Sequence, residues 1–137
     1  MRLNFASGLV AGLCLSAACA VAHEKLAALP DRAPGSNEVL KAKLDSVEGV
    51  EVVISDVIIP ANSAVPRHYH PGEEFLYMIE GSAIHVEEGQ EDRVLKAGDA
   101  YVIRKGKAHS PRAGAEAARA IVFRVHVEGA PERILVE

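Results

Sequence analysis

The sequence predicts an all-β protein whose strands pair antiparallel in a sandwich or barrel, and three observations support this fold class. From Gly49 onward, short runs rich in valine and isoleucine recur, and each run is closed by a turn residue. No long segment between these runs has the apolar spacing of an amphipathic helix. In the last run, Ile121, Phe123 and Val125 alternate with polar residues, which predicts a strand with this apolar face buried and the face of Arg124 and His126 wet.

Length and charge narrow the class of protein further. A chain of 137 residues is the size of one domain, and its hydrophobic fraction of 49% is enough to form a core. The formal net charge is −4, and the sequence has neither a basic run nor basic residues interleaved with aromatic ones. We therefore expect no nucleic-acid partner.

The first 22 residues have the pattern of a secretory signal peptide. Arg2 is followed at residues 5–22 by an apolar run of mostly small side chains, which ends in Ala20-Val21-Ala22. Cleavage there would place the mature protein in the periplasm or outside the cell. The run is short for a membrane span, so an uncleaved anchor is the alternative and the only membrane association we expect.

Cleavage would also decide which side chains can form sites in the mature protein. Cys14 and Cys19 lie within the signal, so the exported domain would have no disulfide and no thiol ligand. Lipidation of Cys19 is disfavoured, because Ser16 stands where a large aliphatic residue is usual. Any metal site in the mature domain must then be built from histidine, aspartate and glutamate.

The remaining chain divides into a lead-in segment at 23–48 and a domain at 49–137. Residues 23–37 contain two prolines and a Gly-Ser pair, which indicates an exposed segment with little structure. Residues 38–49 fit either a short helix or an edge strand. The domain contains the six predicted strands, at residues 50–59, 74–80, 82–88, 93–99, 100–103 and 118–128.

The stretch "HYHPGEE", residues 68–74, has the residue types and spacing of a metal site. Residues two apart on a strand share a face, so His68 and His70 point the same way. The Pro71-Gly72 turn lets Glu74 come back beside them at the start of the next strand. His109, which follows the turn after residues 100–103, is the best candidate for a fourth ligand.

Two motifs give the chain a specific resemblance to the cupin superfamily over about residues 50–128. The first motif, G-x5-H-x-H-x3-4-E-x6-G, falls on His68, His70, Glu74 and Gly81, with Asn62 in place of the leading glycine. The second, G-x5-P-x-G-x2-H-x3-N, falls on Gly98, Gly106 and His109, with Arg104 and Ala113 replacing proline and asparagine.

The resemblance implies the fold, the cofactor and the partners. The fold would be a single jelly roll, a double-stranded antiparallel β-barrel with a metal in its mouth. One divalent ion would be bound by His68, His70, Glu74 and His109. Imidazole and carboxylate ligands suit Fe, Mn, Ni, Co, Cu and Zn, so the ligand set does not identify the metal. A small-molecule ligand or substrate is the expected partner. The resemblance to small cupins also implies a homodimer.

Other polar and large apolar residues have weaker predictions. Glu73 is expected to be solvated beside the turn, and His85 to be an exposed strand residue. His126 has no assigned function. Leu76 and Met78 share the phase of Glu74 and should line the interior below the metal, while Phe123 is expected in the core.

Two classes of function fit this sequence. In the first, the metal binds an oxygen-rich substrate and supports dioxygenase-like chemistry, as in quercetin-dioxygenase-like cupins. In the second, the protein binds or senses a metal or small ligand without turnover, and the fold does not choose between these classes. No catalytic residue beyond the metal ligands can be assigned from the sequence.

Overall fold

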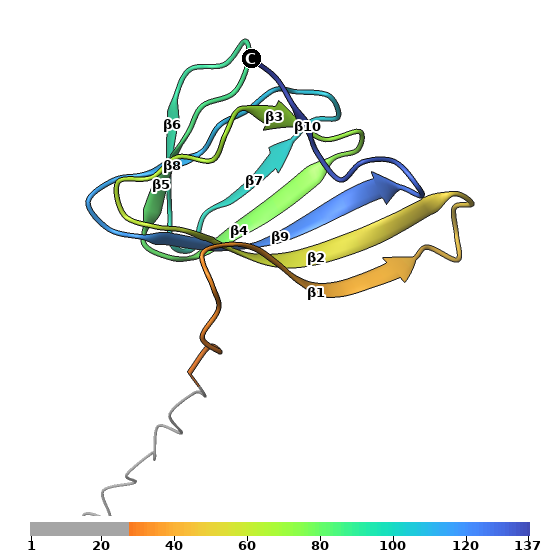
Figure 1. The fold of residues 1–137 in the computed structure, drawn as a ribbon, viewed down its shortest axis with the longest axis horizontal. Coiled ribbons are helices and arrows are strands. Elements are labelled where there is room, and N and C mark those ends of the chain that lie inside the picture. Colours follow the sequence, from red (N-terminus) through yellow and green to blue (C-terminus); the bar gives the residue numbers. More distant parts are fainter. Residues whose placement is uncertain (1–27) are drawn as a thin grey trace, which may run out of the picture.

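The computed structural model describes residues 28–137, so the predicted signal peptide with its two cysteines lies outside the described residues. Within this range the chain is all β, and no helix there is long and apolar enough to cross a membrane (Figure 1). The strands are β1 (Gly35–Lys43), β2 (Val50–Ile59), β3 (His68–Tyr69), β4 (Glu74–Glu80), β5 (Ser82–His85), β6 (Arg93–Lys96), β7 (Ala100–Ile103), β8 (Arg112–Ala113), β9 (Ala118–Val127) and β10 (Ile134–Leu135).

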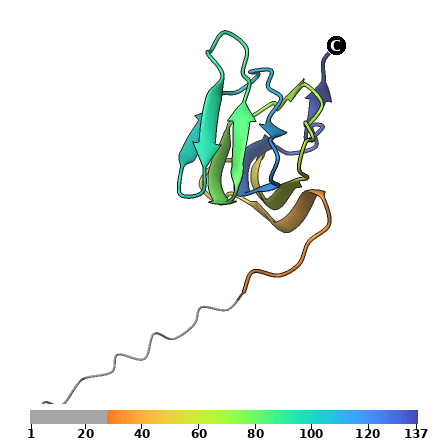
Figure 2. The same ribbon diagram turned by 90° about the vertical axis from the view of Figure 1, so that its left-hand side faces the viewer.

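The strands form two layers with a cavity between them. A five-stranded antiparallel sheet has the order β1-β2-β9-β4-β7. The three-stranded sheet β6-β5-β8 and the pair β10-β3 lie over one face of it (Figures 1 and 2). Isolated β-bridges, such as the one between His68 and His109, link the smaller sheets to each other, but the three sheets do not close into one continuous barrel. The predicted all-β jelly-roll class is confirmed.

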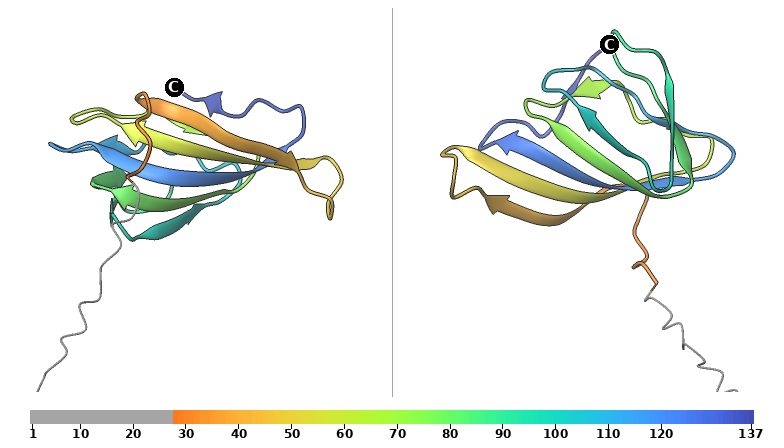
Figure 3. Two further views of the ribbon diagram at one scale, coloured as in Figure 1. Left: turned by 90° about the horizontal axis from the view of Figure 1, so that it is seen from below. Right: turned by 180° about the vertical axis from the view of Figure 1, so that it is seen from behind.

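The centre of the large sheet is a pairing between distant parts of the chain. Strand β9 lies between β2 and β4 and pairs with β2 from Val50 opposite Val127 to Ile59 opposite Ala118 (Figure 3). Strand β4 pairs with the other edge of β9, and Glu74 lies opposite Arg124. This register brings the predicted ligand Glu74 beside a charged residue that is fifty positions later in the sequence.

The lead-in segment contributes the edge strand of the large sheet. The sequence left residues 38–49 as either a helix or an edge strand. In the structure, residues 38–43 belong to β1, which pairs antiparallel with β2. Pro30 lies just before β1, and its carbonyl oxygen accepts a hydrogen bond from the Arg119 side chain at 2.7 Å. Arg119 also pairs with Asp56 at 2.7 Å. The segment is therefore attached to the domain from about residue 30 onward.

The prediction that Ile121, Phe123 and Val125 form the inward face of β9 is wrong. Ala120, Val122 and Arg124 are buried, whereas Phe123 is 41% exposed and lies opposite Phe75 of β4 on the outer face of the sheet. His126, which was expected on a wet face, is also buried. Polar residues occupy the inner face of β9 because each has a partner there: Arg124 bonds to Glu74, and His126 to the carbonyl oxygen of Ala130.

The apolar core lies between the two layers, below the polar part of the interior. It contains Ile59, Met78, Leu95, Val122 and four alanines, and Leu76 packs against it. Leu76 and Met78 also line the interior cavity on the strand that begins with Glu74, as their shared phase predicted. Strand β4 thus carries a polar residue and two apolar ones into the same space.

We expect Met78→Ala to reduce the free energy of unfolding by about 2–5 kcal/mol, because it removes a buried side chain from the core. Met78 is 3% exposed, whereas Phe123, on the outer face of the neighbouring strand, is 41% exposed. Phe123→Ala should therefore cost less than Met78→Ala. Urea unfolding of both variants compares them, and a larger loss for Phe123→Ala would contradict the observed orientation of β9.

Candidate metal centre

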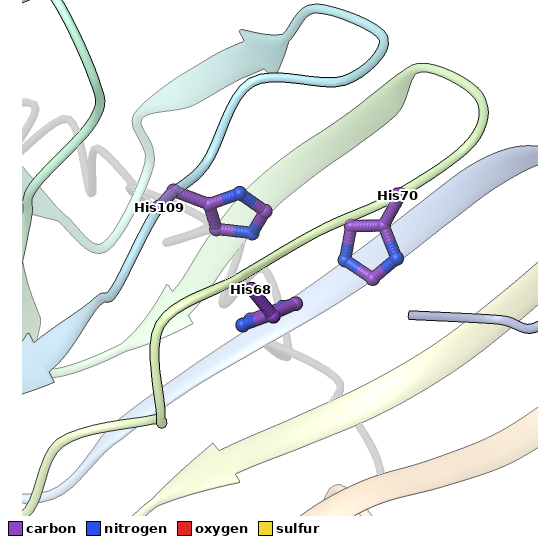
Figure 4. A group of neighbouring side chains, drawn as sticks. All are labelled: His68, His70 and His109. Carbon is purple, nitrogen blue, oxygen red and sulfur yellow. The ribbon is translucent and has the colours of Figure 1, made fainter. Parts of the chain in front are cut away.

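His68, His70 and His109 converge in the interior, as the two sequence motifs predicted. All three are buried, and one ring nitrogen from each lies within 4.8 Å of the others (Figure 4). The ring centroids of His68 and His109 are 4.3 Å apart, and those of His68 and His70 are 4.8 Å apart. Three imidazoles that face one space are a ligand set suited to a divalent transition metal.

Backbone hydrogen bonds join the two segments that carry these histidines. The amide of His68 donates to the carbonyl of His109 at 3.0 Å, and the amide of His109 donates to the carbonyl of His68 at 2.8 Å. The amide of Gly106 donates to the carbonyl of His70 at 3.0 Å. The hairpin at 68–74 and the turn before His109 are therefore fixed to each other directly, before any ion is considered.

Two backbone positions make this arrangement possible. A Cβ at Gly72 would lie 1.6 Å from the carbonyl oxygen of Val125, so only glycine fits where the turn crosses β9. Asn62, in the place of a motif glycine, has a φ of 56°, a left-handed conformation that asparagine tolerates. The replacement of the motif glycine by Asn62 is thus compatible with the turn.

Each of the three histidines has its Nδ1 held by a backbone carbonyl. The partners are Pro66 for His68 at 2.7 Å, Glu132 for His70 at 2.5 Å and Lys107 for His109 at 3.0 Å. A carbonyl oxygen only accepts, so each Nδ1 carries the proton and each Nε2 presents a lone pair. This is the arrangement by which metal-binding histidines are oriented, and it leaves three Nε2 atoms free to bind.

Glu74 joins the cluster through His70. Its Oε2 lies 3.0 Å from Nε2 of His70 and accepts a hydrogen bond from Nε of Arg124 at 2.7 Å. Although close, His70 Nε2 makes no hydrogen bond and is buried. A neutral His70 with its proton on Nδ1 would place two lone pairs opposite each other there, so the contact is favourable only with a proton or a metal ion between the two atoms. The donor set therefore fits a metal ion.

Burial and neighbouring charges set the protonation of these groups. Burial, with the nearby His109 and His70, lowers the pKa of His68 to about 4, and burial also lowers the pKa of His109. Burial acts to raise the pKa of Glu74, but its contacts with His70, Arg124 and His109 outweigh it and lower that pKa to about 2. At neutral pH the His68 and His109 imidazoles are thus uncharged and the Glu74 carboxylate ionised, as metal binding requires.

We expect the metal-free protein to lose stability as the pH falls from about 6.5 to about 4. The pKa of His68 is about 4 in the folded protein and near 6.5 in an unfolded chain, so the unfolded chain binds the proton first. Its contribution is fully present above pH 6.5 and disappears as the pH approaches 4. Urea unfolding across this range measures it, with His68→Gln as the control that should flatten the slope; an unfolding free energy that rises on acidification would contradict the expectation.

The three histidines form part of the lining of a cavity of about 390 Å³. His68, His70, His109, Glu74 and His85 are polar lining residues, and Leu76, Met78, Leu95 and Val122 are apolar ones. His85 was predicted to be an exposed strand residue, and this is wrong, because it is buried with a partner at Glu87. Glu73, expected to be solvated, is only half-buried and does not line the cavity.

Two residues that contribute to the site, Arg124 and Glu132, were not found from the sequence. Arg124 holds Glu74, the carbonyl of Glu132 holds His70, and the Glu132 carboxylate accepts from Arg124 at 2.9 Å. The C-terminal segment is kept in place by β10, where Ile134 pairs with Tyr69 and Leu135 with His68. The spacing of the two motifs does not predict these contacts, because they form only when the fold brings residues near 130 back over the hairpin.

Comparison with known families and structures agrees with this architecture. The sequence profile of the cupin domain matches residues 55–124. This range contains all four predicted ligands and stops at Arg124, so it omits the C-terminal segment. No curated protein sequence matches the chain.

Several solved structures share the fold. A cupin-like protein from Thermotoga maritima superposes with a TM-score of 0.57 and 24% identity, over 62% of this chain and 64% of that one. An uncharacterized protein with a double-stranded β-helix domain from Klebsiella pneumoniae gives 0.57 and 20%, over 80% of this chain and 90% of that one. The DMSP lyase DddQ from Ruegeria pomeroyi gives 0.56 and 24%, over 66% of this chain and 44% of the lyase. The chain thus spans under two thirds of the Thermotoga protein and under half of the lyase.

Proposed function

The chain belongs to the cupin domain family, and on that premise we propose that it is an exported metal-dependent enzyme of dioxygenase-like type, acting on a small oxygen-rich organic molecule. One divalent ion, of Fe, Mn, Ni, Co, Cu or Zn, would be held by His68, His70, His109 and Glu74. The observation that carries this proposal is the set of three Nε2 lone pairs that face one space, each fixed by a carbonyl at its Nδ1.

The surrounding residues have distinct parts in this function. When bound, the ion supplies a Lewis acid for substrate oxygens and, if it is redox-active, a means of reaction with dioxygen. Arg124 holds Glu74 in place and keeps it ionised. Leu76, Met78 and Leu95 exclude water from the far part of the cavity and provide an apolar surface for the body of the substrate.

Metal analysis of the protein purified from its native compartment tests this proposal. Iron, manganese, nickel, cobalt or copper near one per chain, with dioxygen uptake on addition of catechols or vicinal hydroxycarbonyl compounds, is the expected result. Bound zinc without dioxygen uptake would overturn the dioxygenase part and favour the alternative, a protein that binds a metal or small ligand without turnover. Absence of any stoichiometric metal would overturn the whole proposal.

Location and assembly are part of the same proposal. Removal of residues 1–22 would give an exported chain beginning near His23. A homodimer is supported by the outer face of the large sheet, where Phe75, Tyr77 and Phe123 of adjacent strands are 45%, 50% and 41% exposed. Large apolar side chains gathered on one exposed face are typical of an association surface.

Native mass spectrometry of the protein from its own cell compartment is expected to show a dimer of chains that begin near His23. Phe123→Asp should convert the dimer to a monomer, because it introduces a charge into the apolar face. Arg112→Asp, at an exposed position whose partner is Asp92, is the control that should leave the dimer intact. A chain that retains Met1 in the cytosol would contradict export, and an unchanged dimer in Phe123→Asp would contradict this interface.

A further inference from the structure

A second polar cluster lies beside the histidine triad and is not used by it. His85 of β5 is 2% exposed and lines the cavity, and its ring centroid is 5.7 Å from that of His109. Glu87 and Tyr101 lie behind it and do not line the cavity. The cluster therefore presents one residue, His85, to the interior.

Glu87 and Tyr101 fix how the His85 ring is protonated. Nε2 of His85 lies 3.1 Å from Oε2 of Glu87, and the Tyr101 hydroxyl donates to the same oxygen at 2.9 Å. Burial and the bond to Glu87 raise the pKa of Tyr101, which keeps its hydroxyl protonated. An ionised carboxylate only accepts, so Nε2 of His85 carries the proton. This is the opposite tautomer to that of the three metal-site histidines.

The other ring nitrogen of His85 has no partner. Its Nδ1 is buried, and no donor among the described residues reaches it. Buried acceptors in native proteins are nearly always paired, because an unmade hydrogen bond in the interior is costly. With the neutral ring oriented in this way, the missing partner is an O–H or N–H donor on the side of His85 away from Glu87, and His85 lines the cavity.

The rest of the cavity defines the body of that partner. Leu76, Met78 and Leu95 form an apolar surface in the same cavity, and its volume of about 390 Å³ is at the lower end of ligand-binding sites. A molecule that uses both features has an apolar body and a hydroxyl at one end. Water would satisfy His85 alone and leave the apolar surface unused.

We propose that this cavity binds a small, mainly apolar molecule whose hydroxyl group donates a hydrogen bond to Nδ1 of His85. Glu87 and Tyr101 are positioning residues that keep Nδ1 as an acceptor. The inference deepens the proposed function and rests on it only in placing this hydroxyl beside the ion. It narrows the substrate class to phenols, enols and related alcohols, and it makes His85 the residue that distinguishes a free hydroxyl from its ether.

Phenol and anisole are the matched probes, because they differ in the hydroxyl hydrogen and share the aromatic body. Each is titrated by NMR into the full chain after removal of metal. The wild-type protein should bind phenol about threefold to tenfold more tightly than anisole, the worth of one neutral hydrogen bond. In His85→Leu the preference for phenol should be lost. His126→Leu, which removes a buried histidine that does not line the cavity, is the control that should keep the preference.

A second measurement needs no variant. In the wild-type protein, the ¹⁵N resonance of His85 Nδ1 should shift on addition of phenol and stay unchanged with anisole. Equal affinities for the two probes, no binding of phenol at millimolar concentration, or an Nδ1 resonance that ignores phenol would each overturn the proposal. Since the protein is metal-free in these titrations, this failure is distinct from failure of the metal proposal, which is read from metal content alone.

Discussion

Substitution of His109 by alanine is expected to weaken the binding of a divalent ion by at least about 100-fold. Loss of a group that only supports a metal ligand already costs 10- to 100-fold in affinity, and a lost ligand should cost more. His109 belongs to the three-histidine cluster and is 1% exposed, so no solvent-exposed group can readily replace it. Isothermal titration of zinc into wild type and variant measures the change.

The two adjacent glutamates provide the matched control. Glu74→Gln should also weaken metal binding, because Glu74 is 3.0 Å from the free nitrogen of His70. Glu73→Gln should leave the affinity nearly unchanged, since Glu73 does not line the cavity. If the Glu73 change empties the site and the Glu74 change does not, the register of the hairpin is wrong. If His109→Ala and Glu74→Gln both retain wild-type affinity, this cluster is not the metal site.

Substitution of Arg124 by methionine is expected to reduce the free energy of unfolding by about 3–5 kcal/mol, the range for breaking a buried ion pair on one side. Arg124 is 6% exposed and donates to Glu74 at 2.7 Å, to Glu132 at 2.9 Å and to Ser55 at 3.2 Å. Without the guanidinium, the Glu74 carboxylate keeps its buried charge and loses its main donor. Urea unfolding at neutral pH in the presence of a chelator measures the loss.

Two comparisons make this result interpretable. Arg112→Met breaks a pair with Asp92 in which both side chains are half exposed, and it should cost only about 0–1 kcal/mol. The double variant Arg124→Met with Glu74→Gln should recover part of the loss, because it removes the unpaired charge. A loss in Arg124→Met no larger than in Arg112→Met would show that the buried pair contributes little to stability.

The fold class and the histidine positions followed from local features of the sequence. Short apolar runs closed by turns predicted an antiparallel β protein, and the phase of His68 and His70 depended only on the two-residue period of a strand. Glu74 and His109 needed the motif spacing as well, which reflects how the two hairpins meet. These features are local in the sequence, and they are also where the structure agrees with the prediction.

The sequence did not predict the orientation of β9 or the burial of His85, and both failures have the same physical reason. Alternation shows that a strand has two faces, but it identifies the inner face only when the interior is apolar. Here the interior contains Arg124, His126 and His85, each buried against a partner that is identified only by the fold. The preference of large apolar residues for burial therefore pointed to Phe123, which lies on the outside.

The pairing of β2 with β9 also determines the order of events when the chain folds. It joins residues 50–59 to residues 118–127, so the long segment between them must be closed into a loop before the centre of the large sheet can form. Proteins dominated by such distant pairings fold in milliseconds to seconds, since the entropy of closing the long loop is lost before the contacts form. Strand β9 also pairs with β4, so Glu74 and Arg124 come together only when residues 118–127 have joined the sheet, and the Glu132 carbonyl over His70 comes from a still later part of the chain. Because these contacts join distant parts of the chain, we expect them to form late in folding, so that a bound ion slows unfolding more than it accelerates folding.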